Sequence, residues 1–211
     1  MTILLIMTAA AVATAAAPNA ATFVGEYDGH QMEMAVGLKL EADGRFQYGL
    51  SYGALDEEAE GRWSLAADSV LLTSDPITKA KFVLVAQKQA KRGVLHITLK
   101  CPGQLSPQLF DAAVTLASGQ MTGGQLTDEG LSLPVTNGDP VINVRLFFPM
   151  FELRGDPVLI DAKKGYDFSF RFEPHDLGKV DFQSTPLKIE NGELILVRYG
   201  RAIRFHHILA P

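Results

Sequence analysis

Apolar and polar residues alternate along residues 32–72. In the first segment the even positions carry apolar side chains: Met32, Met34, Val36, Leu38 and Leu40. After a turn at 41–44 the even positions are apolar again: Phe46, Tyr48, Leu50 and Tyr52. A period of two residues is typical of a β-strand with one buried face. We therefore predict a β-hairpin whose two strands bury their even-numbered side chains against one core.

Further strands are predicted at short intervals after this hairpin. Residues 58–65 alternate with the odd positions inward, and 70–72, 81–86 and 94–100 are further apolar segments. Short connections place consecutive strands side by side in space. We therefore expect an antiparallel meander over residues 21–101, folded as an open barrel or a sandwich.

A boundary between two modules is expected at residues 101–108. This segment holds two prolines and a glycine and shows no periodicity. Alternation returns at 141–148, and Asn191-Gly192 is a strong short-range signal for a hairpin. No later segment keeps the 3.6-residue periodicity of a helix over three turns. The predicted fold class is therefore all-β, with a second β-sandwich-like module over residues 102–211.

Residues 1–20 are predicted to be a secretory signal peptide. An uncharged stretch of aliphatic residues and alanines leads to Ala13-Thr14-Ala15, an A-x-A cleavage signal. We expect cleavage between Ala15 and Ala21, and a retained membrane anchor is the alternative. No later segment approaches the length of an apolar membrane span. The mature chain is therefore expected to be periplasmic or secreted.

Composition and charge narrow the class of protein further. Apolar residues make up 47% of the 211 residues, which is enough for a core without metal or disulfide support. The single cysteine, Cys101, has no partner within the chain for a disulfide, and an exported protein without disulfides suits the bacterial periplasm. The net charge is -5 and the 19 basic residues are scattered, so the basic footprint of a nucleic-acid-binding protein is missing.

Catalytic motifs with a specific mechanism are absent from the sequence. There is no G-x-S-x-G nucleophile elbow, no H-E-x-x-H zinc motif, no C-x-x-C pair and no Gly-rich phosphate loop. We therefore expect a protein that is not an enzyme. A hydrolase whose catalytic residues are dispersed along the chain is the alternative, and no residues can be named for it.

Four aromatic residues are the candidate ligand-binding set: Phe46, Tyr48, Tyr52 and Trp63. They share one predicted strand face, so they could line a barrel-like cavity. The alternative is a packed core, because a small barrel fills its interior with side chains.

A second candidate site is a copper site formed by His30, Met32 and Met34. If a strand runs through His30, the three side chains project from one face at successive spacings of roughly 7 Å. An imidazole and two thioethers are soft ligands that suit Cu(I). The alternative is that Met32 and Met34 continue the apolar strand face and pack in the core. No cofactor is expected if that alternative holds.

The N-terminal pattern resembles a known meander. Its elements are Gly25-x-Tyr27, Leu38-x-Leu40 with Asp43-Gly44-x-Phe46, Gly61-x-Trp63 and 70–72. This pattern is similar to that of lipocalin-like bacterial envelope proteins, including the NlpE-type copper-resistance lipoproteins. The resemblance covers about a quarter of the chain and implies a lipocalin-like meander. Residues 112–134 also resemble the prealbumin-like, carboxypeptidase-regulatory β-sandwich, which implies a non-catalytic accessory module.

Together these observations predict an exported, non-enzymatic protein of the bacterial envelope. It is expected to bind a protein partner or a small ligand through its β-sheet surfaces, with no nucleic acid and no membrane span after signal cleavage. The alternative function is periplasmic copper binding through the His-x-Met-x-Met segment.

Overall fold

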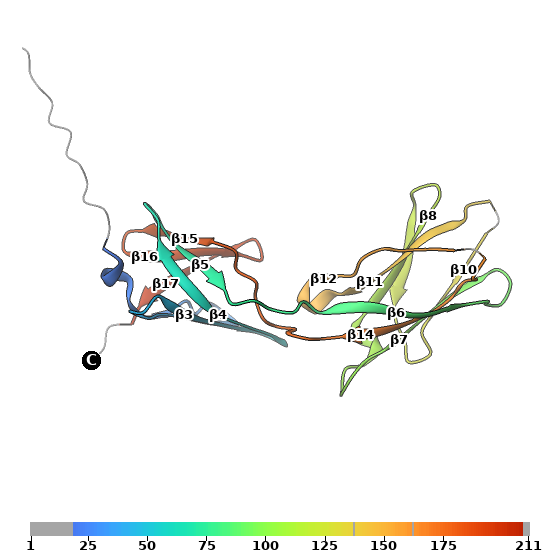
Figure 1. Ribbon diagram of the computed structural model, residues 1–211, viewed down its shortest axis with the longest axis horizontal. Helices are drawn as coiled ribbons and strands as arrows, with labels where there is room; N and C mark the ends of the chain where they lie inside the picture. Colours follow the sequence, from blue (N-terminus) through green and yellow to red (C-terminus); the bar gives the residue numbers. More distant parts are fainter. Residues whose placement is uncertain (1–18, 137, 162, 209–211) are drawn as a thin grey trace, which may run out of the picture.

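The computed structural model describes residues 19–136, 138–161 and 163–208, and these form two β-modules that lie end to end (Figure 1). Within these ranges, all the regular elements are strands apart from three short 3-10 helices, so the predicted all-β class is confirmed. No helix in the described ranges has the length and apolar character needed to cross a membrane. The predicted signal peptide falls almost wholly on residues 1–18, which lie outside these ranges.

The first module is a closed barrel of eight antiparallel strands. The order around the barrel is β1-β17-β16-β15-β5-β4-β3-β2. Five strands come from the N-terminal part: β1 (Gly25–Asp28), β2 (Met34–Leu40), β3 (Arg45–Tyr52), β4 (Leu55–Leu65) and β5 (Ser69–Ser74). Three come from the end of the chain: β15 (Thr185–Glu190), β16 (Glu193–Arg198) and β17 (Arg201–His207). This architecture is consistent with the expected lipocalin-like meander, but the meander is closed by distant strands.

The second module is a two-sheet sandwich inserted between β5 and β15. One sheet has the order β10-β7-β14-β6: β6 (Lys81–Lys88), β7 (Val94–Lys100), β10 (Leu131–Pro134) and β14 (Asp167–Glu173). The other has the order β12-β11-β8-β9, with β13 also paired to β11: β8 (Asp111–Leu116), β9 (Met121–Gln125), β11 (Val141–Phe148), β12 (Leu153–Arg154) and β13 (Val158–Leu159). Both sheets contribute buried side chains to one core.

The predicted division at residues 101–102 does not separate these modules. The strands β6 and β7 precede it but belong to the sandwich, and β15–β17 follow it but belong to the barrel. Residues 101–108 instead connect the two sheets of the sandwich, and the 3-10 helix η2 (Pro107–Leu109) ends this connection. The expected boundary was wrong because alternation shows that a strand has one buried face, but not which core that face meets.

Strand alternation was confirmed over most of the first hairpin. Met34 pairs with Tyr52 and Leu40 pairs with Phe46, and the even side chains of 34–40 and 46–50 are buried. The alternation of buried and exposed side chains ends on both sides of the range 34–50, since Met32 and Tyr52 are exposed. A tight turn with reciprocal backbone hydrogen bonds between Gln31 and Met34 precedes β2, so Met32 is 88% exposed.

The two ends of the barrel are built differently. At the end away from the sandwich, the 3-10 helix η1 (Ala20–Phe23) caps the barrel (Figure 1). Phe23 is buried in the barrel core, and its carbonyl accepts a hydrogen bond of 2.8 Å from the Tyr27 hydroxyl. At the other end, the 3-10 helix η3 (Pro149–Phe151) of the sandwich faces the barrel, and Phe151 packs against both cores.

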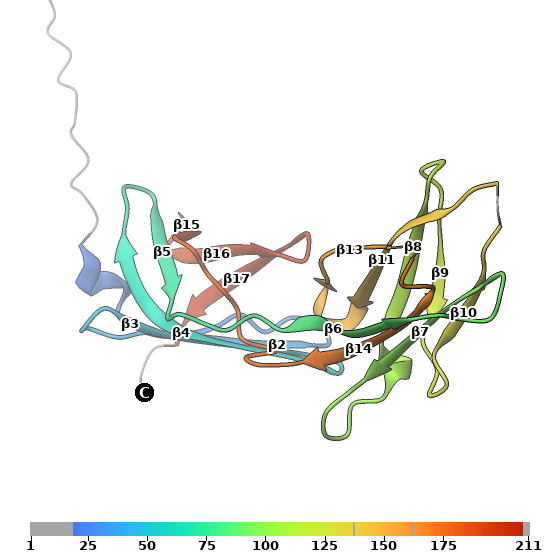
Figure 2. The ribbon, with the colours of Figure 1, turned by 45° about the vertical axis from the view of Figure 1, so that its right-hand side comes forward.

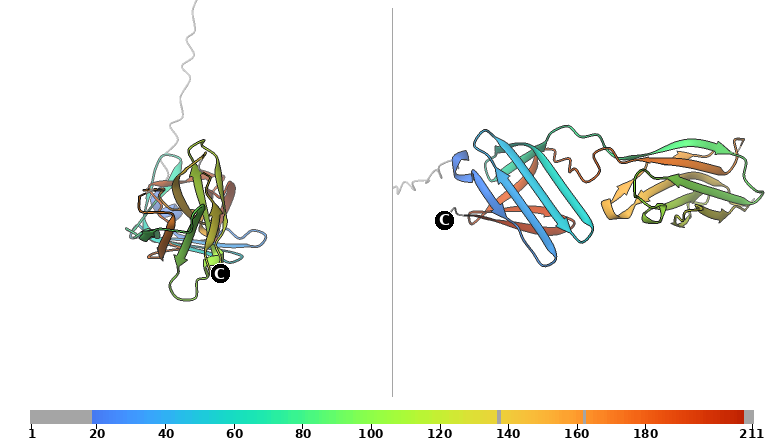
Figure 3. Two further views of the ribbon diagram at one scale, coloured as in Figure 1. Left: turned by 90° about the vertical axis from the view of Figure 1, so that its right-hand side faces the viewer. Right: turned by 90° about the horizontal axis from the view of Figure 1, so that it is seen from below.

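The barrel wall has a gap on the side where the sandwich is inserted. Residues 61–65 of β4 pair with β5, and residues 193–195 of β16 pair with β15. Residues 55–60 of β4 therefore extend beyond β5, and residues 196–198 of β16 extend beyond β15, although each keeps its other neighbour, β3 or β17. Figures 2 and 3 show the two connecting segments, green and orange-red, which run from this region to the sandwich.

The second connecting segment closes part of the gap. The amide of Val180 donates a hydrogen bond to the Glu58 carbonyl (2.8 Å), and the Glu58 amide donates to the Gly178 carbonyl (3.0 Å). The side chains of Val180 and Phe182 enter the barrel core. This segment is therefore an irregular part of the barrel wall rather than a free linker.

Substitution of Phe182 tests this conclusion. We expect Phe182→Ala to lower the free energy of unfolding of the barrel by about 3 to 5 kcal/mol, because it removes a buried aromatic ring from the core. The measurement is urea unfolding followed by the fluorescence of Trp63, the only tryptophan of the chain. The exposed neighbour provides the control, Gln183→Ala, with a loss below about 0.5 kcal/mol. Equal small losses in both variants would show that the segment is not part of the core.

Candidate ligand-binding site

A carboxylate and a guanidinium face each other across the gap in the barrel wall. Glu57 lies on the inward face of β4, between the buried Leu55 and Ala59. Arg198 lies on the inward face of β16, two residues after the buried Leu196. Both positions follow from strand periodicity, since side chains two residues apart share a face.

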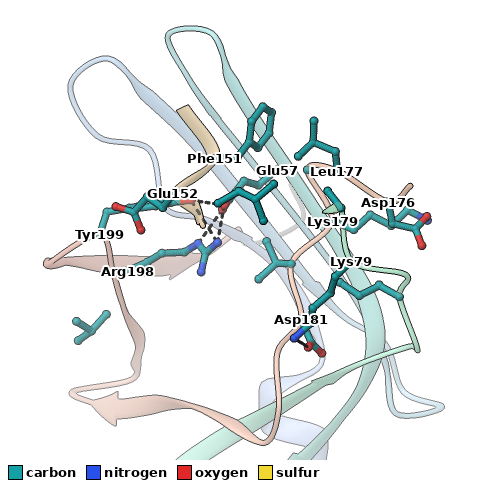
Figure 4. Close-up of a pocket in the computed structure, with 16 residues that line it drawn as sticks. Glu57, Lys79, Phe151, Glu152, Asp176, Leu177, Lys179, Asp181, Arg198 and Tyr199 are labelled. Atoms are coloured by element: carbon teal, nitrogen blue, oxygen red, sulfur yellow. Dashed lines mark hydrogen bonds and ion pairs between the residues drawn. The ribbon is translucent and has the colours of Figure 1, made fainter. Parts of the chain in front are cut away.

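The two side chains form a bidentate ion pair, as Figure 4 shows. Arg198 Nε donates to Glu57 Oε2 at 2.7 Å, and Arg198 Nη2 donates to Glu57 Oε1 at 2.5 Å. The Tyr199 hydroxyl also donates to Glu57 Oε1. The Glu57 side chain is only 7% exposed and the Arg198 side chain 23%. Such a pair is costly to bury, and it is tolerated here because charge-assisted hydrogen bonds satisfy both carboxylate oxygens.

Two aromatic rings lie close to the guanidinium of Arg198. The Cζ atom of Arg198 lies 4.8 Å from the ring centre of Tyr199 and 5.9 Å from that of Phe182. Burial alone lowers the pKa of Arg198, but the hydrogen bond and charge of Glu57 outweigh it and raise the pKa above its usual value. Burial, reinforced by the bond to Glu57, raises the pKa of Tyr199 to about 12. At neutral pH the Arg198 guanidinium is therefore charged and the Tyr199 phenol keeps its proton.

Tyr48 adds a buried hydroxyl to this group. Its ring contacts the ring of Phe182 edge-on, with 5.2 Å between the centres. Its hydroxyl oxygen is buried and has no hydrogen-bond partner within the described residues. Burial raises the pKa of Tyr48, and the positive charge of Arg198 offsets only part of this rise. The barrel interior thus holds one polar group whose hydrogen bonding is unsatisfied.

Two clefts adjoin the ion pair, and both are lined by Glu152, Arg198 and Tyr199. The side cleft, about 450 Å³, opens along the connecting segments. Its Lys79 and Lys179 side chains pair with Asp181 (2.9 Å) and Asp176 (3.7 Å), so their charges are compensated.

The second cleft, which we call the mouth cleft, has a volume of about 560 Å³. It lies between the open end of the barrel and helix η3 of the sandwich. Most of its lining is apolar: Met34, Leu50, Tyr52, Leu55, Pro149 and Met150. A cleft of this size with few polar groups is typical of a small-molecule site.

The four aromatic residues predicted to bind a ligand do not form one site. Phe46, Tyr48 and Trp63 are at most 8% exposed and belong to the packed barrel core. The indole nitrogen of Trp63 donates to the Glu41 carbonyl at 2.9 Å, which fixes the ring within the structure. Tyr52 is 40% exposed and lines the mouth cleft. The packed-core alternative therefore describes three of the four, and Tyr52 alone lies in a cleft.

The predicted copper ligands do not share a strand face. His30 and Met32 precede β2, and the turn from Gln31 to Met34 includes Glu33 at a positive φ of 63°. Met32 is 88% exposed, whereas Met34 is 5% exposed and faces the barrel core. The prediction required a strand through His30, and this turn breaks it. Among the described residues, no cluster of three or more His, Cys, Asp or Glu side chains could hold a metal ion either.

The residues at the ion pair were not predicted from the sequence. Glu57 lies in the acidic segment 56–60, which resembles a solvated hairpin connection in composition. A signal was nevertheless present, because Glu57 shares its odd-numbered parity with the inward residues Ala59 and Trp63. Arg198 likewise shares parity with Leu194 and Leu196. Charged residues at inward positions of a strand were therefore the available signal.

The fold and the clefts define a class. This is an all-β protein with an eight-stranded barrel that carries an inserted two-sheet β-module, and a mostly apolar cleft lies at the junction. Comparison of the chain with protein-family models, curated proteins and solved structures gave no significant match.

Removal of the unsatisfied hydroxyl tests the description of Tyr48. We expect Tyr48→Phe to raise the free energy of unfolding by about 1 kcal/mol, because a buried polar group without a partner is costly. The matched control is Tyr27→Phe, which removes a hydroxyl that donates to a carbonyl at 2.8 Å and should cost about 1 kcal/mol. Urea unfolding measures both changes. A loss of stability in Tyr48→Phe would show that this hydroxyl is hydrogen-bonded in solution.

Neutralisation of Glu57 tests the ion pair. We expect Glu57→Gln to cost roughly 3 kcal/mol, because it leaves the mostly buried Arg198 charge without its counterion. The control on the same strand is Glu60→Gln, which changes an outward side chain that is 63% exposed and should cost less than about 1 kcal/mol. Urea unfolding followed by Trp63 fluorescence measures the difference. Similar losses in both variants would refute a structural role for the pair.

Proposed function

We propose that this protein binds a small molecule with an apolar body in the mouth cleft. The main support is the chemistry of that cleft, in which apolar side chains of the barrel and of η3 surround a volume of about 560 Å³. The charged and hydroxyl-bearing groups at its margin are few: Arg198, Tyr199 and Arg201 of the barrel, and Glu152 at the end of η3. An apolar cleft with a few oriented polar groups is the usual form of a ligand site.

Exposed apolar side chains support the same location. Tyr52, Met150, Val197 and Tyr199 are between 36% and 72% exposed, and each lines at least one of the two clefts. Exposed apolar groups that gather in one region are a feature of binding sites rather than of an ordinary surface. The proposal thus narrows the expected binding through β-sheet surfaces to the junction of the two modules.

The proposed role is binding without catalysis. Both oxygens of Glu57 already accept hydrogen bonds from Arg198 and Tyr199. A general base needs a free lone pair within reach of the substrate, so Glu57 is poorly placed for that role. The free thiol of Cys101 is also an unsuitable nucleophile, since burial raises its pKa to about 11.

We also propose that the protein acts in the bacterial envelope, in the periplasm or outside the cell. The support is the leader-like sequence of residues 1–20 and the sequence pattern shared with lipocalin-like envelope proteins. Kinship with the NlpE-type lipoproteins in particular, and of the sandwich with carboxypeptidase-regulatory modules, rests on those sequence patterns alone.

A neutral fluorescent probe tests the proposed binding. N-phenyl-1-naphthylamine should bind the protein with an increase in fluorescence, and Met150→Asp should weaken its affinity about tenfold, or about 1.4 kcal/mol, because the variant places a charge in the apolar cleft. The matched control is Met121→Asp, since Met121 is 62% exposed on β9 of the sandwich and does not line the mouth cleft. Absence of probe binding to the natural protein, or equal weakening in both variants, would refute the proposal.

A further inference from the structure

The guanidinium of Arg198 is only partly used by Glu57. Its Nε and Nη2 atoms donate to the carboxylate, and Nη2 also donates to the Tyr199 hydroxyl. Its Nη1 atom forms no hydrogen bond to any described residue. Nη1 is also not fully buried, because the Tyr48 hydroxyl is the only fully buried side-chain polar atom without a partner among the described residues. The Arg198 side chain is also more exposed than that of Glu57, at 23% against 7%. Arg198 therefore has a donor that Glu57 does not use, on a side chain that lines the mouth cleft.

A second arginine faces the same cleft. Arg201 is directly opposite Arg198 in the antiparallel register of β16 and β17, across the turn at Tyr199 and Gly200. Residues opposite each other in such a pair project from the same face of the sheet. The parity of β17 agrees, because Ile203, two residues after Arg201, is buried inside the barrel. Arg201 accordingly lines the mouth cleft.

The positive charge of Arg201 is not compensated within the described part of the chain. Arg201 has no ion pair within 4.0 Å there, whereas Arg204, on the outer face of the same strand, pairs with Glu193 at 3.3 Å. Two like charges opposite each other in a sheet are unfavourable unless a counterion separates them. Glu57 supplies one negative charge for the two arginines, so one positive charge is left over on this wall.

The opposite wall of the cleft limits the charge that a ligand could carry. Glu152, at the end of η3, lines the cleft and forms no ion pair within 4.0 Å with Arg198 or Arg201. Its carboxylate would repel a second negative charge on a ligand. The arrangement favours one negative charge at the arginine side over two.

We infer that the mouth cleft takes an amphiphile whose head group bears a single negative charge, such as a carboxylate. This inference rests on the proposed function and specifies its ligand. The head group accepts hydrogen bonds from Arg201 and from Nη1 of Arg198, because planar guanidinium groups match a carboxylate well. The apolar chain lies along Leu50, Leu55 and Met150.

Displacement of bound N-phenyl-1-naphthylamine tests the head group. The competitors are dodecanoate, dodecan-1-ol and dodecyltrimethylammonium, each below the concentration at which it aggregates. They share the same apolar chain and differ in charge. We expect dodecanoate to displace the probe at a concentration about tenfold lower than dodecan-1-ol, and the cation to be the weakest. The advantage of dodecanoate should shrink as salt is added.

Two variants test whether Arg201 causes the preference for dodecanoate. Arg201→Gln should remove most of the preference for dodecanoate over dodecan-1-ol. Both competitors are measured against the same probe in the same variant, so a change in probe affinity cancels from this preference. Arg204→Gln makes the same change on the outer face of the same strand and should keep the preference. Both side chains lie at the surface, so neither variant endangers the fold.

The possible results separate the inference from the proposed function. Equal displacement by dodecanoate and dodecan-1-ol, or a preference for the cation, would overturn the anionic head group while the binding of an apolar ligand stands. An equal loss of the preference in Arg201→Gln and Arg204→Gln would also overturn it. Failure of the natural protein to bind the probe or any competitor would overturn both.

Discussion

Each strand of a closed barrel needs a neighbour on both sides, and the insertion of a second module makes that condition hard to meet here. Strand β4 is 11 residues long, but β5 pairs only with residues 61–65 of it before the chain leaves for the sandwich. The edge that remains would expose unpaired backbone groups. The returning segment covers this edge at Glu58, and its residue Phe182 fills the space behind it. The ion pair and the clefts at the junction depend on the way this segment covers the free edge of β4.

The gap in the wall explains why two charged side chains, Glu57 and Arg198, occur at inward positions of the barrel. Elsewhere the inward positions of β2, β3 and β16 carry aliphatic or aromatic side chains, as a small barrel requires, and none is charged. At the gap, Glu57 and Arg198 connect the two strand ends that have no intervening strand. A hydrophobic pair of similar volume could be as stable there, so stability alone does not account for the charges. The ion pair also holds an arginine with a free donor at the edge of an apolar cleft, and this is the feature that a ligand could use.

Local structure was predictable from the sequence where it depends on neighbouring residues. The alternation of 34–50 identified strands and their buried faces, and Asn191-Gly192 identified a hairpin whose two residues have positive φ angles of 53° and 85°. The assignment of strands to modules was not predictable in this way. Strand β5 pairs with β15 more than a hundred residues later, and such long-range pairing leaves no local pattern. The predicted aromatic and copper sites are not present as single sites. The aromatic prediction assumed an open cavity where the barrel is packed, and the copper prediction assumed a strand where a turn lies.

The candidate site was missed because composition and position gave opposite indications. An acidic run such as 56–60 has the composition of a solvated surface, and three of its five residues are indeed exposed: Asp56, Glu58 and Glu60. Strand periodicity nevertheless places Glu57 inward, where a carboxylate is unfavourable without a partner. An inward charge on a strand implies a second charge nearby, and the partner must come from another inward position. Arg198 is such a position, on a strand whose other inward residues, Leu194 and Leu196, are buried. A search of predicted strands for charged residues at inward parity would therefore have found both halves of the pair, although not the gap that brings them together.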